Sequence, residues 1–81
     1  MNKQELIAKV NAVLAEEFEV DEAIITPEAN IKQTLELDSL SLVDMVALID
    51  NEFAVKIPTT ELSKLQTFEA LYNYLEEKTN A

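Results

Sequence analysis

Asp38 and Ser39 are the side chains of this chain best suited to chemistry, and they stand side by side before an apolar stretch. The serine hydroxyl can carry a group as an ester, and the free amide N–H groups of a helix start would favour an attached anion. The oxygens of Asp38 suit Mg²⁺, so this carboxylate could help to hold a metal ion during the attachment. The same pair is also a common helix cap, and Ser41 with Asp44 fits a capping box. Composition and spacing do not decide whether this pair is a helix cap or an attachment site.

Most catalytic chemistry is excluded by residue types that the chain lacks. It has no histidine and no cysteine, which removes the usual general base, a Ser-His-Asp triad, disulfide bonds and Cys/His zinc sites. It also has no glycine, the residue that a calcium-binding loop and the oxyanion turn of a serine hydrolase both use. We therefore expect neither catalytic residues nor a resident metal, and the chain is predicted not to be an enzyme.

The charge of the chain is strongly acidic, because sixteen acids and six lysines give a net charge of −10. Nucleic acids and anionic membrane surfaces would be repelled, whereas a basic protein would be attracted. The longest apolar run, Met45 to Ile49, is far too short to span a membrane, and the amino-terminal residues are too polar for a signal peptide. We expect a cytoplasmic protein with no nucleic-acid partner and no membrane span.

The elements that must position the Asp-Ser pair are helices. Apolar residues recur at helical spacing over residues 3–17, and Asn2 is a candidate cap for this first helix. A second helix is predicted over residues 39–53. The polar stretch between them, residues 19–38, is predicted to be a long loop whose isolated apolar residues pin it across the helices. These apolar residues are Ile24, Ile25, Ile31, Leu35 and Leu37.

The rest of the chain predicts two more helices, because Pro58 prevents the second helix from continuing. Thr59 or Thr60 can cap a short third helix, and Thr67 can cap a fourth. The inner stripe of the fourth helix consists of Phe68, Leu71, Tyr72 and Leu75. No strand pattern or repeat is visible. Residues 1–81 are therefore predicted to form one all-α domain, a small bundle of three main helices plus one short helix, with a long loop between the first and second helices.

The helix predicted over residues 39–53 has two apolar faces when it is wound at about 100° per residue. One narrow sector faces the core, and it contains Leu42, Met45, Val46, Ile49 and Phe53. A second sector combines apolar with polar residues, namely Leu40, Val43, Asp44, Ala47, Asp50 and Asn51. A small domain needs only one such face for its core. The second face is either a docking surface for a partner with apolar and basic groups or is covered by the long loop, and periodicity leaves both readings open.

Residues 35–58 carry three short motifs at defined spacing, namely Asp38-Ser39-Leu40, Glu52-Phe53 and Val55-x-Ile57-Pro58. This arrangement resembles the acyl carrier protein family, in which Asp-Ser-Leu is followed by an acid-rich helix that ends in Glu-Phe-Gly-Val-x-Ile-Pro. The length, the acidity, the long first loop and the order of the helices agree over nearly the whole chain. Asp-Ser-Leu alone is a weak signal, but the three motifs at this spacing are a strong one.

The resemblance implies a carrier function. Ser39 would receive 4′-phosphopantetheine from coenzyme A, and Asp38 would assist the Mg²⁺-dependent phosphopantetheinyl transferase. The covalent arm would carry acyl intermediates as thioesters and present them to acyl-transfer and chain-elongation enzymes of fatty-acid or polyketide-type biosynthesis, which dock through basic patches. The implied docking residues are Leu40, Val43, Asp44, Ala47 and Asp50. The residues implied to line an interior pocket for the acyl chain are Leu42, Met45, Val46 and Ile49. The carrier is expected to be a monomer.

Several residues depart from the family pattern. Glu36 and Ala54 stand where the family usually has glycine, Leu42 replaces a small polar residue, and Lys56 often corresponds to an acid. These departures favour a specialised carrier. Two alternatives stay open: a D-alanyl or peptidyl carrier that uses the same serine chemistry, and an unmodified acidic helical adaptor in which Ser39 is only a helix cap.

Overall fold

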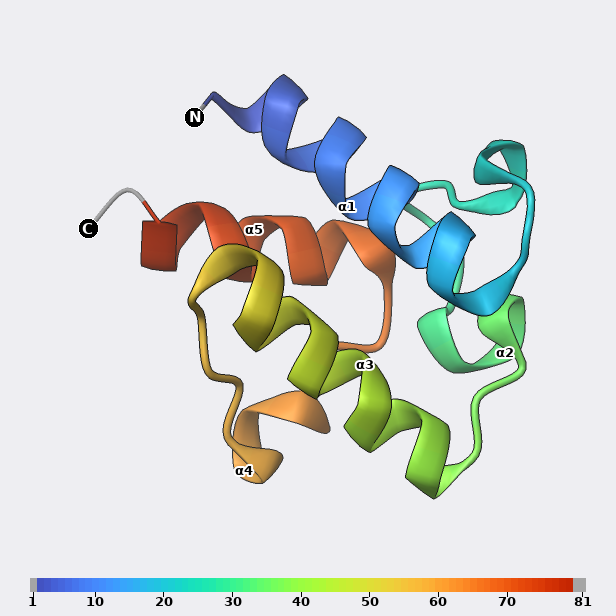
Figure 1. The fold of residues 1–81 in the computed structure, drawn as a ribbon. Helices are drawn as coiled ribbons and strands as arrows, with labels where there is room; N and C mark the ends of the chain where they lie inside the picture. The colour runs from blue at the N-terminus through green and yellow to red at the C-terminus, as the bar shows by residue number, and fades with distance from the viewer. Residues whose placement is uncertain (1, 80–81) are drawn as a thin grey trace.

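The structure, a computed structural model, describes residues 2–79 and is built from helices (Figure 1). The long helices are α1 (Lys3–Phe18), α3 (Ser39–Phe53) and α5 (Phe68–Thr79). The short ones are the 3₁₀ helix η1 (Glu22–Ile24), α2 (Ile31–Leu35) and α4 (Thr59–Leu62). No strand forms within residues 2–79, where the only ladder-type pairing is an isolated bridge between Asn30 and Thr67. The predicted all-α bundle is confirmed.

The stretch expected to be a long loop contains η1 and α2. Asn30 starts α2, because its Oδ1 accepts a hydrogen bond of 3.0 Å from the Gln33 N–H. Four of the apolar residues predicted to pin this stretch are buried, namely Ile25, Ile31, Leu35 and Leu37. Ile24 is an exception, since it is 46% exposed. Of this adjacent pair, Ile25 takes the inward position.

Two of the predicted helix caps are confirmed and one is wrong. The Asn2 Oδ1 accepts a hydrogen bond of 2.8 Å from the Glu5 N–H at the start of α1. The Thr67 Oγ1 accepts one of 3.3 Å from the Ala70 N–H at the start of α5. Pro58, rather than Thr59 or Thr60, occupies the cap position of α4, and no side-chain cap bond forms there. Its backbone carbonyl starts the helix instead, by accepting from the N–H groups of residues 61 and 62.

Three helices end in left-handed backbone conformations without glycine. Glu19, Glu36 and Ala54 have φ angles of 54°, 52° and 56° and follow α1, α2 and α3 respectively. A side chain with a Cβ atom in this region costs roughly 1–2 kcal/mol. This cost is offset in part because the N–H of each residue donates a backbone hydrogen bond to the preceding helix, such as the 2.8 Å bond from the Ala54 N–H to the Asp50 carbonyl.

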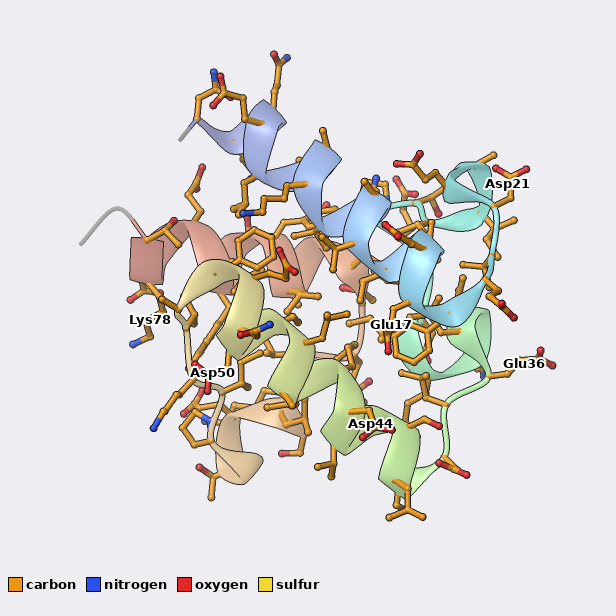
Figure 2. All side chains as sticks on the ribbon, viewed as in Figure 1. Glu17, Asp21, Glu36, Asp44, Asp50 and Lys78 are labelled. Atoms are coloured by element: carbon orange, nitrogen blue, oxygen red, sulfur yellow. The ribbon has the colours of Figure 1, made fainter. Side chains whose placement is uncertain are left out.

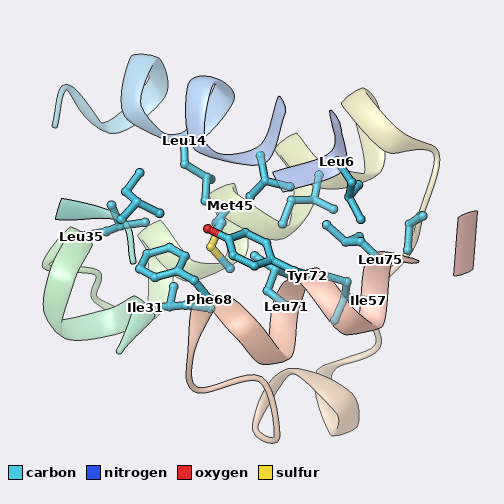
Figure 3. Packing of buried hydrophobic residues seen from close by; sticks show 14 of the residues in the cluster. Leu6, Leu14, Ile31, Leu35, Met45, Ile57, Phe68, Leu71, Tyr72 and Leu75 are labelled. Carbon is cyan, nitrogen blue, oxygen red and sulfur yellow. The ribbon is translucent and has the colours of Figure 1, made fainter. Parts of the chain in front are cut away.

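The core lies where the inner stripes of α1, α3 and α5 meet (Figure 3). Met45 and Ile49 of α3 are each 1% exposed. The predicted stripe of α5 is buried in full, and α1 packs along that helix. The core residues of the three long helices are Leu6, Val10, Leu14, Met45, Ile49, Phe68, Leu71, Tyr72 and Leu75. Val55 and Ile57, from the segment that follows α3, complete one side of the core.

Lys9 of α1 joins α1 to the carboxyl end of α3. Its Nζ donates a hydrogen bond of 3.1 Å to the Glu52 carbonyl and lies 4.9 Å from the centre of the Phe53 ring. A positive charge is favourable at this end of a helix, where carbonyl groups lack partners. Lys9 therefore holds α3 against α1 at the end opposite to Asp38.

The backbone conformation at Ala54 predicts that glycine is preferred there. Replacing Ala54 with glycine should raise the free energy of unfolding by about 0.5–1 kcal/mol. The relief of the Cβ clash in the folded chain outweighs the extra conformational entropy that glycine gives to the unfolded chain. Ala8 is an exposed residue inside α1, so Ala8→Gly should lower the same quantity by about 1 kcal/mol. Urea unfolding of both variants measures these changes. Equal losses in the two variants would contradict the left-handed end of α3.

The acidic surface predicts that salt stabilises the fold. Among residues 2–79 the structure contains one ion pair, between Lys64 and Glu61 at 3.8 Å, and both side chains are exposed. Most of the acidic side chains in this part of the chain therefore lack a cationic partner, and the repulsion that accompanies the net charge of −10 is screened by added ions. The melting temperature followed by circular dichroism should rise with moderate NaCl at neutral pH. A constant or falling value would contradict this expectation.

Candidate functional site

The start of α3 is held by Asp38. The Asp38 Oδ1 accepts a hydrogen bond of 2.8 Å from the Ser41 N–H, and its backbone carbonyl accepts one of 2.9 Å from the Leu42 N–H. Asp38 has the extended backbone of a cap residue, while Ser39 is the first residue of the helix. Ser39 is therefore not the cap. The adaptor alternative, which gives Ser39 only that role, loses its structural basis.

Hydrogen bonding to Ser41 also lowers the pKa of Asp38. The Ser41 backbone N–H, followed by its side-chain hydroxyl, lowers the pKa of this exposed carboxyl below its usual value. Both interactions stabilise the ionised form. The capping box expected between Ser41 and Asp44 does not form, because Ser41 lies inside α3 and its N–H is bonded to Asp38. An ionised carboxylate thus stands directly before Ser39 at neutral pH.

Ser39 presents an accessible hydroxyl at the first turn of α3. Its side chain is exposed, and no side-chain hydrogen bond within the described part of the chain involves its Oγ. The preceding segment is anchored by the buried Leu37, and the following helix is anchored by Met45. The first N–H groups of a helix have no partner within it, so a phosphodiester on this oxygen would meet favourable partial charges. The residues therefore fit a covalently attached phosphate group.

The second face of α3 is open to solvent. Leu40 is 78% exposed and Val43 is 61% exposed, so the long loop does not cover them. Asp44 and Ala47 are also exposed, while Asp50 is half-buried. Figure 2 shows Asp44 and Asp50 on the same helix. The five predicted docking residues therefore lie on one helix, and the reading in which the loop covers Leu40 and Val43 is wrong.

A hollow beside this face brings in a residue that the sequence analysis missed. Glu17 of α1 lines it together with five residues of α3, namely Asp44, Ala47, Leu48, Asp50 and Asn51. Glu17 is separated from Asp44 by a long stretch of sequence, and no periodicity within either helix relates the two. Only the packing of α1 against α3 places their carboxylates around the same hollow.

The four residues predicted to shelter an acyl chain do not surround one cavity. Met45 and Ile49 are packed in the core, whereas Leu42 and Val46 are half-buried. Leu42 lines a groove of about 410 Å³ between α2, α3 and α4, together with Asn30, Lys32, Leu62, Ser63 and Gln66. Val46 lines a different hollow. The sequence analysis missed Leu62 and Gln66 as groove residues, because short segments such as α4 carry too few turns to reveal a face.

Known proteins resemble this chain over most of its length. Residues 8–75 match the family described as "Phosphopantetheine attachment site". An acyl carrier protein from Petrotoga mobilis is 40% identical over 80 residues, which is 99% of this chain and 94% of the relative. One from Rubrobacter xylanophilus is 35% identical over 81 residues, which is 100% of both chains. The solved structure of an acyl carrier protein from Enterococcus faecalis has a TM-score of 0.78 and 27% identity, and the match covers 95% of this chain and 98% of that one.

The hydrogen bond at the start of α3 predicts different effects for two replacements of Asp38. Asparagine caps helices about as well as aspartate, whereas alanine cannot cap. At neutral pH, Asp38→Ala should lower the melting temperature clearly, and Asp38→Asn should leave it close to that of the unchanged chain. Equal losses in both variants would show that the carboxylate charge, rather than the cap geometry, holds this end of α3.

The lowered pKa of Asp38 predicts a pH dependence of stability. Because the pKa in the folded chain lies below the usual value of 3.8, the carboxylate contributes fully to stability above that pH, and its contribution is lost as the pH falls further. The melting temperature of the unchanged chain should therefore fall relative to that of Asp38→Asn below about pH 3.8. Parallel melting curves from neutral to acidic pH test this, and a constant difference between the two proteins would contradict it.

Proposed function

The chain belongs to the acyl carrier protein family, and we propose that Ser39 is the residue on which it carries 4′-phosphopantetheine. Acyl carrier proteins are carriers rather than enzymes, and this chain functions with a phosphopantetheinyl transferase and with biosynthetic enzymes. When bound, the arm supplies a thiol that holds an acyl group as a thioester. Tethering of this kind raises the effective concentration of the acyl group at each enzyme that binds the carrier.

The environment of Ser39 carries the proposal. The chain contains three serines. Ser41 is half-buried and its N–H donates the cap hydrogen bond to Asp38, and the Ser63 Oγ donates to the Thr60 carbonyl at 3.1 Å. Ser39 alone combines an exposed hydroxyl with a neighbouring ionised carboxylate and the free N–H groups of a long helix. These features suit attachment of a phosphodiester.

Asp38 has two roles in this proposal. Its hydrogen bond to the Ser41 N–H orders the first turn of α3 and so holds Ser39 in a constant position. Its ionised oxygens are hard ligands of the kind that Mg²⁺ prefers, so we assign it the task of assisting the transferase. Within the described residues, no group of three or more acidic side chains is arranged to bind a metal by itself. We therefore propose that the transferase completes the metal site.

Partner enzymes are proposed to dock on the exposed face of α3. Leu40, Val43 and Ala47 offer apolar contact there, while Asp44 and Asp50 attract basic patches. A small interface guided by charge suits a carrier that must leave each enzyme after reaction. None of the helices within residues 2–79 has the length and apolar character needed to cross a membrane. Action as one monomeric domain over residues 1–81, and a cytoplasmic location, stay predictions.

The acyl chain is proposed to enter between α3 and α4, along the groove that Leu42 and Leu62 line. Because Met45 and Ile49 are packed against the other long helices, a chain can reach them only if these helices separate. An interior of normal packing density leaves no room for it otherwise. Shelter of the cargo would thus depend on an opening of the bundle, and a short acyl group would stay at the surface.

Attachment to Ser39 predicts a change in mass. Incubation of the unmodified chain with coenzyme A, Mg²⁺ and a broad-specificity phosphopantetheinyl transferase should add one phosphopantetheine group, measured by intact-protein mass spectrometry. Ser39→Ala should gain no mass. Because Ser39 is not the helix cap, this variant should keep the circular dichroism spectrum of the unchanged chain, which makes it a folded control.

Two further results would decide the proposal. Asp38→Asn keeps the cap but lacks the carboxylate charge, so it should be modified more slowly if Asp38 assists the transfer. Modification of Ser39→Ala, or no modification of an unchanged chain confirmed to be free of the arm, would refute Ser39 as the attachment residue.

A further inference from the structure

The exposed face of α3 lies between two hollows, one lined mainly by polar and acidic residues and the other mainly by apolar ones. On the side of α1, the hollow that includes Glu17 and Asp44 is rich in carboxylates. On the other side, a second hollow lies between α3 and the segment that follows it. Its lining consists of Val43, Val46, Ala47, Asp50, Lys56 and Ile57. Ala47 and Asp50 line both hollows and therefore form the ridge between them.

The second hollow is mostly apolar and is open to solvent. It measures about 250 Å³. Ile57 is buried and Val46 is half-buried, whereas Val43 and Ala47 are exposed. Pockets of this kind receive the large apolar side chains that supply most of the affinity at protein interfaces. A hollow that is continuous with Val43 and Ala47 therefore extends the docking face toward Ile57.

Within residues 2–79, Lys56 is the only cation that lines the second hollow, where it stands beside the Asp50 carboxylate. Val55 and Ile57 are both buried while Lys56 is exposed. This alternation is expected for an extended segment that packs one side on the core. No ion pair of Lys56 occurs among the described residues. The cation is therefore available at the rim, across from Asp50 on the ridge.

We propose that this carrier binds a partner with charges of both signs, arranged on either side of one apolar anchor. The anchor side chain enters the hollow formed by Val43, Val46 and Ile57. Basic groups of the partner face Glu17, Asp44 and Asp50, and an acidic group faces Lys56. The proposal rests on the proposed function, because it specifies the partner that docks on the α3 face. Lys56 is the residue that selects this partner.

The charge arrangement has two physical consequences. A partner with only basic groups around its anchor meets repulsion from Lys56, so it binds less well than a partner with an acid at that position. A partner that approaches in the reversed direction places its acid against Glu17 and Asp44 and its bases against Lys56. Only one orientation satisfies both sides, and this orientation determines where Ser39 points relative to the partner.

The experiment uses two synthetic amphipathic peptides of roughly 15 residues, a length at which designed helices begin to form in water. Both have a central leucine with lysines on one side, and they differ only in a glutamate or a lysine on the other side. Binding to the full chain is followed by amide chemical shifts of Val43, Val46 and Ile57. The glutamate peptide should bind about two- to fivefold more tightly, the range expected for an exposed charge pair.

Charge reversal at Lys56 provides the decisive comparison. Lys56→Glu should reverse the preference between the two peptides. The control variant is Lys3→Glu, which makes the same change in net charge at the start of α1, where Lys3 contacts Asn73 of α5. It should keep the original preference. A preference that survives Lys56→Glu, the same response in both variants, or no binding of either peptide to the unchanged chain would overturn the proposal.

The mass assay on the same protein samples separates this proposal from the attachment site. Modification of Ser39 without any peptide preference would refute the role of Lys56 and leave the carrier function intact. A charge-dependent preference without modification would support the docking surface and refute the attachment residue.

Discussion

The burial of Met45 and Ile49 is the constraint on which the arrangement of α3 depends. These residues are four apart and lie on one side of the helix, so their contacts with α1 and α5 determine its rotation. Once that rotation is set, Leu40, Val43 and Ala47 must face outward. A chain of 81 residues has only one core and cannot bury both faces of the helix. The core thus leaves the exposed apolar surface on which we propose that partners dock.

The position of Ser39 along this helix depends on a second, local interaction. Asp38 satisfies an N–H group that the helix start leaves without a partner, and the same contact lowers the pKa of its carboxyl beside the serine. At the other end of the helix, Lys9 and the left-handed Ala54 donate hydrogen bonds to its last carbonyl groups. Glu36 and Ala54, where related carriers usually have glycine, occupy backbone regions that glycine would occupy with less strain. The chain keeps these turns because buried neighbours, such as Leu35, Leu37 and Val55, hold the backbone around them.

Charge is distributed unevenly over the exposed face of α3. The carboxylates of Glu17, from α1, and Asp44 lie on one side of this face, and Lys56, from the segment after α3, lies on the other. An interface of this type obtains its selectivity from complementary and repulsive pairs more than from its area. Such selectivity suits a carrier, whose affinity for each partner must stay low enough to permit release. A net charge of −10 then acts at longer range, where it brings basic partners toward the surface.

The sequence by itself determined the three long helices, the core stripe of α5 and the place of the Asp-Ser pair at the start of a two-faced helix. Those features depend on local spacing, which a periodic pattern records directly. Tertiary structure decided which member of the pair caps α3, since both residue types cap well and only the backbone conformation distinguishes Asp38 from Ser39. It also decided that Leu42 and Val46 line separate hollows, and that Glu17 and Lys56 flank the same helix. These relations join residues that are distant in sequence or belong to short segments, and the packing of the core, rather than any local pattern, brings them together.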